Sequence, residues 1–173
     1  NTIKALGDVD RMQGEYASAR ARYEEARPIF AAIGDRLGEA NTIQALGDVD
    51  RMQGEYASAR ARYEEARPIY AAIGARLGEA NTIQALGRLA QAEKQYDEAA
   101  TLLNDVLVTY QAIGDRMSEA HTYWYLGLLR EEERRWDDAI AALERSIEVY
   151  RAIGLERDVR LSERRLAAIQ ARM

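Results

Sequence analysis

The chain has 173 residues and a net charge of −5, and 47% of its residues are apolar and 31% charged. This balance excludes a disordered chain, and the absence of cysteine excludes disulfides and thiolate metal sites. No apolar run approaches the roughly 20 residues that a membrane-spanning helix needs, and the acidic chain has no basic stripe to bind nucleic acid. We therefore expect no membrane and no nucleic-acid partner, and a cysteine-free chain suits a cytoplasmic location.

The sequence is a set of internal repeats. Residues 1–40 and 41–80 are nearly identical, and the same period continues more loosely through 81–120 and 121–160. The first two repeats differ only in the pairs Lys4 and Gln44, Phe30 and Tyr70, and Asp35 and Ala75. Such periodicity predicts stacked helical units, so we expect a single array over residues 1–173.

Each repeat is predicted to form two helices, as the second repeat shows. Apolar residues recur at helical spacing over 36–53 and again over 56–73. Asp35 is a suitable N-cap for the first helix, while Gly54 and Gly74 end the two helices. Because only two or three residues connect them, consecutive helices must pack antiparallel.

A mid-helix glycine in each repeat predicts a close approach between helices. Gly47 lies inside the first helix of its repeat, where glycine costs about 1 kcal/mol relative to alanine. The cost is tolerable if another helix comes close, and Ala59 on the second helix is the expected partner. Gly7, Gly87 and Gly127 repeat the choice.

The C-terminal region predicts one further helix over 156–171. Residues 161–173, which follow the fourth repeat, contain the end of this helix. Its surface is rich in charge, which is typical of a helix that caps a repeat array. Four helix pairs and this capping helix give about nine helices and an all-α fold.

Several positions that recur in register carry a family resemblance: Leu46, Gly47, Tyr56, Ala59, Tyr63 and Ala66. This pattern resembles the tetratricopeptide repeat (TPR), and the forty-residue period is similar to the longer variety found in spindle-orientation adaptors and bacterial signalling proteins. The resemblance covers essentially the whole chain. It implies a right-handed α-solenoid of antiparallel helix pairs whose first helices line a concave face.

The chain departs from the family where a large aromatic residue is common, four residues after the helix leucine. Asp10, Asp50, Ala90 and Arg130 stand there instead. We expect a salt link to replace aromatic packing at these positions.

The resemblance places a polar stripe of candidate peptide-binding residues on the concave face. In the second and third repeats these residues are Asn41, Gln44, Asp48, Arg51, Asn81, Gln84 and Arg88. Stacking turns the amides into ladders, which begin at Asn1 and Lys4 in the first repeat. Amides both donate and accept hydrogen bonds, so the ladders either pair with a peptide backbone or simply solvate an open groove.

Charged pairs on the stripe have two interpretations. Asp48 and Arg51 are three residues apart, a spacing that favours a salt link within the helix. If a ligand binds, Arg51 and Arg88 are the natural contacts for an acidic group.

The fourth repeat breaks the polar pattern. His121, Trp124 and Leu128 replace the Asn, Gln and Asp or Arg of earlier repeats. Trp124 either anchors a ligand, as aromatic residues do at binding hot spots, or packs against Arg164 or Arg165 of the capping helix. Tyr123 and Trp136 are expected in the core.

Catalysis has little support, because the chain has one histidine, no cysteine and no phosphate-binding loop. We expect a non-enzymatic scaffold, without metal or cofactor, that binds a protein or peptide segment. Because Asn1 falls inside the first helix, we expect a fragment of a larger regulatory protein. The alternative is a structural or self-association module whose copies form a homo-oligomer through an open apolar N-terminal end.

Overall fold

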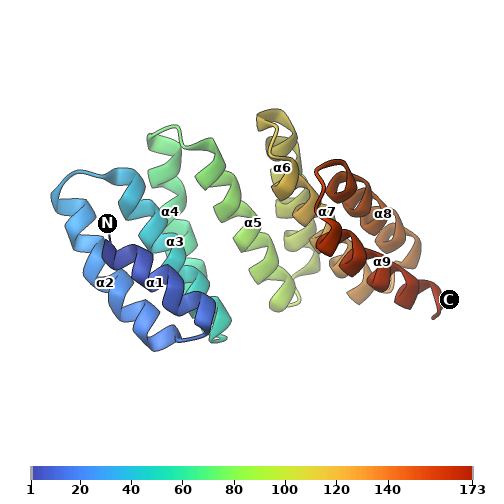
Figure 1. The fold of residues 1–173 in the computed structure, drawn as a ribbon, viewed down its shortest axis with the longest axis horizontal. Coiled ribbons are helices and arrows are strands. Elements are labelled where there is room, and N and C mark those ends of the chain that lie inside the picture. Colours follow the sequence, from blue (N-terminus) through green and yellow to red (C-terminus); the bar gives the residue numbers. More distant parts are fainter. Residues whose placement is uncertain (1, 173) are drawn as a thin grey trace. The chain divides into compact units, whose positions relative to one another are not determined.

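The computed structural model describes residues 2–172, and within them it contains nine helices joined by short turns (Figure 1). The helices are α1 (Thr2–Gln13), α2 (Tyr16–Ala32), α3 (Arg36–Met52), α4 (Tyr56–Ala72), α5 (Arg76–Ala92), α6 (Tyr96–Ile113), α7 (Arg116–Glu132), α8 (Trp136–Ala152) and α9 (Glu156–Gln170). The predicted all-α class and helix number are confirmed, and the expected spans 36–53, 56–73 and 156–171 each end within one residue of the observed helix.

The chain divides into two compact units, with the boundary at Leu89 and Ala90 inside α5. In the first unit, α1 to α4 pack each against the next, and α1 also touches α3. In the second unit, α6 packs on α7, α7 on α8 and α8 on α9. Within each unit the packing of successive helices follows the antiparallel pairs that the short connections predict.

The turns show where the backbone needs a left-handed residue. Gly54 and Gly74 adopt φ angles of 79° and 69°, which confirms both as helix ends. Lys94 and Arg134 stand at the places that correspond to Gly54, and they adopt φ angles of 61° and 60°. A side chain in this region costs roughly 1–2 kcal/mol, so the later repeats keep the turn at a cost in stability.

Two aspartates cap first helices, of which Asp35 was predicted from the sequence. The Asp35 carboxylate accepts a hydrogen bond of 2.8 Å from the Gly38 backbone N–H, and Asp115 accepts one of 3.0 Å from Ser118. These bonds satisfy backbone donors that the helix itself leaves open.

The mid-helix glycines allow a tyrosine ring to approach. A Cβ atom added to Gly47 would lie 2.7 Å from Cε1 of Tyr63, and one added to Gly7 would lie 2.8 Å from Cε1 of Tyr23. The expected close approach is confirmed, and the atoms nearest to Gly47 belong to Tyr63 and Arg62 rather than to the expected Ala59. Helical side chains lean toward the N-terminus, so Tyr63 covers the turn before it and reaches the glycine in place of Ala59.

Salt links form at Asp10 and Asp50, as expected, whereas Ala90 packs in an apolar cluster instead. Asp50 is only 1% exposed, and its Oδ1 lies 3.1 Å from Nη1 of Arg20. Asp10 accepts a hydrogen bond of 2.6 Å from Nε of Arg22. Burial raises the pKa of the Asp50 carboxyl, while Arg20 and Arg62 oppose the shift.

No helix among residues 2–172 combines the length and the apolar character that crossing a bilayer requires.

Candidate binding site

The first unit has a polar hollow of about 350 Å³, lined by α1, α3 and α5, which are the first helices of the first three repeats. Four predicted site residues line it: Asn41, Gln44, Asp48 and Asn81. Lys4, Asp8 and Arg11 of α1 complete it, and Lys4 forms an ion pair with Asp8 at 2.9 Å. The proposed start of one ladder, Asn1, lies outside the described residues.

Tyr70, on the second helix of its repeat, contacts two amides of the polar stripe. The Tyr70 hydroxyl lies 2.7 Å from Oδ1 of Asn41 and 2.9 Å from Oε1 of Gln44, and Thr82 donates to the same Gln44 oxygen at 3.3 Å. The Tyr70 hydroxyl carries one proton, which the Asn41 oxygen accepts at the shorter distance, while the Gln44 oxygen accepts from Thr82. These contacts engage the amide oxygens and not the NH₂ groups, which are hydrogen-bond donors. The amides are therefore fixed in position, and a peptide carbonyl is the group that suits them.

Asp48 is engaged by a tyrosine as well. The Tyr63 hydroxyl donates to Oδ1 of Asp48 at 2.8 Å. Burial raises the pKa of the Tyr63 hydroxyl, and Asp48 adds to the shift while Arg51 opposes it. Asp48 and Arg51 thus meet around the tyrosine hydroxyl, and Nε of Arg51 is buried without a hydrogen-bond partner in the described chain.

Arg51, Gln84 and Arg88 do not line the polar hollow. All three are half-buried. Their use as ligand contacts stays a prediction.

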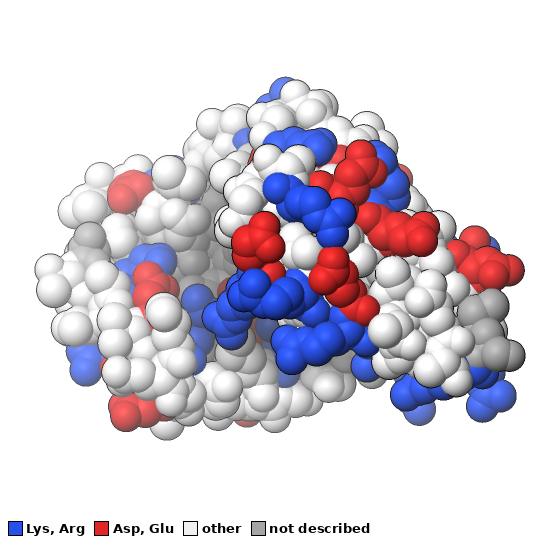
Figure 2. All heavy atoms as spheres, turned by 45° about the vertical axis from the view of Figure 1, so that its right-hand side comes forward, with Lys and Arg blue, Asp and Glu red and all other residues white. Residues whose placement is uncertain are grey.

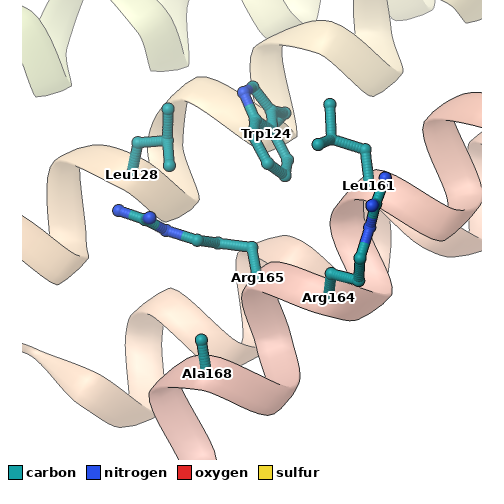
Figure 3. Close-up of a pocket in the computed structure, with 6 residues that line it drawn as sticks. All are labelled: Trp124, Leu128, Leu161, Arg164, Arg165 and Ala168. Carbon is teal, nitrogen blue, oxygen red and sulfur yellow. The ribbon is translucent and has the colours of Figure 1, made fainter.

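The second unit has a larger and more apolar hollow, of about 520 Å³, between α7 and α9 (Figure 3). We call it the Trp124 hollow; its lining residues are Trp124, Leu128, Leu161, Arg164, Arg165 and Ala168. Figure 3 shows Trp124 between Leu128 and Leu161, with Arg165 extended across toward Leu128. The predicted residues Trp124 and Leu128 are thus brought together with the capping helix.

Trp124 has a packed side and a side that borders the hollow, and its role as a ligand anchor stays a prediction. Its ring packs against the buried cluster of Ala139, Leu143 and Ile169, so one part of the side chain is structural. The same half-buried side chain also borders the open hollow opposite Arg165. It is therefore held firmly while it presents apolar surface, as a hot-spot residue does.

The arginines of the hollow differ in how they are neutralised. Arg165 donates to Glu131 at 2.6 Å, and Arg172 donates to the same buried carboxylate at 3.1 Å. Arg164 donates to the backbone carbonyl of Arg160 at 3.3 Å and has no carboxylate partner among the described residues. Figure 2, in which the right-hand side of Figure 1 comes forward, shows basic side chains gathered beside acidic ones.

His121 lies on the other side of Trp124, in a smaller pocket of about 190 Å³ that Trp124 also lines. Its ring meets the edge of Tyr150, with centroids 5.6 Å apart and planes at 69°. The three predicted residues of the fourth repeat therefore border two adjoining hollows, which Trp124 and Leu161 share.

The capping helix supplies lining residues that were not predicted as part of the site. Leu161, Arg164 and Ala168 stand forty residues after His121, Trp124 and Leu128, so they continue the same stripe. Extending the period through 156–171 would have identified them.

Two core predictions are only partly confirmed. Tyr123 is half-buried. Its hydroxyl accepts a hydrogen bond of 3.2 Å from Gln111, and the Arg145 guanidinium lies 5.7 Å from its ring centroid. Trp136 is half-buried as well, and it packs against the same cluster as Trp124.

Residues 2–172 contain no group of three or more His, Cys, Asp or Glu side chains that could hold a metal ion.

Similar structures agree with this architecture. The chain is similar to aspartyl phosphate phosphatase F from Bacillus subtilis (TM-score 0.86, 17% identity), with 96% of this chain and 44% of that one covered. It is similar to the Rap conjugation gene regulator of plasmid pLS20 in complex with the Phr* peptide (TM-score 0.76, 18% identity), with 83% and 40% covered. A signal transduction ATPase with a tetratricopeptide repeat sensor from Pyrococcus horikoshii gives a TM-score of 0.87 at 15% identity, with 98% and 26% covered.

The chain thus spans less than half the length of these three proteins, and their low identity shows the fold alone. A search of curated protein sequences gave no match. The sequence profile of the tetratricopeptide repeat family matches residues 1–72 and 78–152, which is most of the chain. Together with the helix pairs and their glycine–tyrosine contacts, this match shows that the chain belongs to the tetratricopeptide repeat family.

Proposed function

We propose that the chain is a non-enzymatic scaffold that binds a protein or peptide segment, within a larger regulatory protein. The Trp124 hollow is the observation that carries this proposal. It combines an aromatic side chain held by a buried cluster, an apolar floor, and an arginine without a carboxylate partner in the described chain. Apolar pockets with a few fixed polar groups are the usual form of a binding site.

The two units would contribute differently to one ligand class. The Trp124 hollow accepts an apolar side chain, with Arg164 near enough to attract a carboxylate beside it. The polar hollow offers amide donors at Asn41 and Gln44, which suit backbone carbonyl groups of any sequence. A similar fold is known in complex with a peptide in the plasmid regulator, which supports the class of ligand proposed here.

A peptide-display selection against the chain tests the proposal. We expect selected peptides to bind through an apolar residue, and Trp124→Ala should weaken them by about 2 kcal/mol. Val108→Ala is the matched control, because Val108 is an apolar residue of α6 that is 66% exposed and lies outside the hollow. Equal binding by the wild type and Trp124→Ala would exclude Trp124 as the anchor.

Self-association is the second candidate, and exposed apolar residues of α1 favour it. Leu6 and Val9 are 43% and 47% exposed, whereas their equivalents Leu46 and Val49 are buried at 1% and 0%. Met12 extends this face. Two copies that covered this face would form a dimer. Light scattering over a concentration series would detect the dimer, and Leu6→Glu is the control that should abolish it. A monomer at the highest concentration argues against this function.

A further inference from the structure

The small pocket beside the Trp124 hollow carries a chemistry of its own. It lies among α7, α8 and α9 and has a volume of about 190 Å³. Trp124, Tyr125 and Tyr150 place three aromatic rings around it, and His121 lines it too. Aromatic faces are electron-rich, so a group of rings around one small space attracts a cation.

Two polar residues of this pocket, Ser162 and Asp158, have no cationic partner in the described chain. Ser162 is 0% exposed, and its hydroxyl oxygen has no hydrogen-bond partner in the described chain although it lines the pocket. Asp158 is half-buried in the same wall and has no Lys or Arg partner among residues 2–172. A buried hydroxyl without a partner is costly, and a ligand that donates hydrogen bonds would satisfy both groups.

Charge decides which ligand fits. Asp158 is the one charged side chain among the described lining residues when His121 is neutral. The nearby arginines Arg164 and Arg165 line the adjoining Trp124 hollow instead (Figure 3). The pocket therefore offers a negative charge, hydroxyl oxygens and aromatic rings, a combination that selects a cationic group and rejects a carboxylate.

We infer that this pocket binds a cationic side chain, lysine or arginine, of the peptide segment. The inference rests on the proposed function, because Trp124 and Leu161 line both hollows and one segment can fill them together. The ammonium or guanidinium donates to Asp158 and Ser162 and stacks against the tyrosine rings. The neighbouring residue of the segment then places its apolar side chain in the Trp124 hollow.

The experiment uses the full chain and small probes. Nα-acetyl-lysine amide is titrated at about pH 8, where an ordinary imidazole is neutral, and binding is followed by NMR through the ring of His121, the single histidine of the chain. Nα-acetyl-arginine amide decides between the two cations, and Nα-acetyl-norleucine amide is the uncharged control. We expect one of the cationic probes to shift the His121 signals with saturation, and the norleucine probe to leave them unchanged.

Variants locate the site. Asp158→Asn should weaken the cationic probe roughly tenfold, and Ser162→Ala severalfold, because each removes a hydrogen bond to a charged group. Asp137→Asn is the matched control, since Asp137 and Asp158 both lie in the first turn of a helix, α8 and α9, but Asp137 is exposed and lies outside the pocket. Should Asp158→Asn fail to fold, Ser162→Ala and the comparison of probes on the wild-type chain still decide.

Two results would overturn the inference: no saturable shift with either cationic probe, or equal binding of the norleucine probe. Failure of the peptide-display selection would instead affect the proposed function, so the two failures are distinguishable. A cationic probe that binds while no peptide is selected would support the pocket and contradict the scaffold.

Discussion

The two hollows are lined by equivalent positions of the repeat and have opposite chemistry. Repeat positions 1, 4 and 8 are Asn41, Gln44 and Asp48 in the polar hollow of the first unit. In the second unit, positions 4 and 8 are Trp124 and Leu128 on α7, followed by Leu161, Arg164 and Ala168 on α9. The backbone is repeated while the surface is not, so the family fold provides the stripe and the diverged repeats give it a different surface chemistry.

The difference extends behind the stripe. In the first unit, tyrosine rings fill the space left by Gly7 and Gly47, and their hydroxyls bind Asp8 and Asp48. In the second unit, Leu143 fills the space at Gly127. The polar stripe of the first unit is thus anchored by hydrogen bonds to buried rings, whereas the more apolar stripe of the second unit rests on aliphatic packing at Gly127.

The largest expected effect is at the glycine contacts. Gly47→Ala should destabilise the protein by about 2 kcal/mol, because the Tyr63 ring is fully buried and its hydroxyl is fixed on Asp48. Gly127→Ala should cost about half as much, since a leucine can change rotamer. Chemical denaturation measures both values. In a Tyr63→Leu background the cost of Gly47→Ala should fall to that of Gly127→Ala, and an unchanged cost would contradict the difference between the units.

The next effect concerns the bonds that hold the polar stripe. Tyr70→Phe should cost about 1 kcal/mol, because Asn41 and Gln44 lose the hydroxyl that contacts both oxygens. Denaturation of the single variant and of its combination with Asn41→Ala measures the coupling. Strictly additive effects would show that the hydroxyl does not hold the amide.

A smaller effect distinguishes the turns. Lys94→Gly and Arg134→Gly should each stabilise the protein by up to about 1 kcal/mol, because glycine relieves the left-handed backbone but loosens the unfolded chain. The reverse change, Gly54→Lys, should destabilise it by a similar amount. Thermal unfolding midpoints test the three variants together, and a loss of stability in Lys94→Gly would contradict this account of the turn.

The smallest effect on stability comes from the titration of the buried tyrosines, which is absent at neutral pH and sets in above pH 10. Burial, followed by the hydrogen bond with Asp8, raises the pKa of Tyr23 to about 12. The folded state therefore holds this proton where the unfolded state releases it, so stability is full below pH 10 and declines as the pH rises toward 12. Tyr23→Phe should flatten this decline in alkaline denaturation curves, and an unchanged slope would contradict the burial of the hydroxyl proton.

The fold was predictable from the sequence because its signal is repeated. The spacing of apolar residues, the glycines after each helix and the Asp35 cap all recur or are local, and each is visible without tertiary contacts. The partner of Gly47 was not predictable from residue size alone. Tyr63 reaches it through the direction in which helical side chains lean, which a comparison of small residues ignores.

The site was predictable in part. The polar stripe and Trp124 follow from repeat position, and the structure groups Asn41, Gln44, Asp48 and Asn81 in one hollow. The Tyr70 contacts with this stripe join separate helices, and the sequence does not show such contacts. The unpartnered hydroxyl of Ser162 likewise depends on which neighbours surround it, which only coordinates reveal.

Our central proposal is that specific binding resides in the Trp124 hollow of the second unit rather than in the polar hollow of the first. Calorimetric affinities of one selected peptide for the wild type, Trp124→Ala and Asn41→Ala test this claim most directly. We expect Trp124→Ala to lose about 2 kcal/mol and Asn41→Ala no more than about 1 kcal/mol. A larger loss in Asn41→Ala than in Trp124→Ala would place recognition in the first unit and contradict the account.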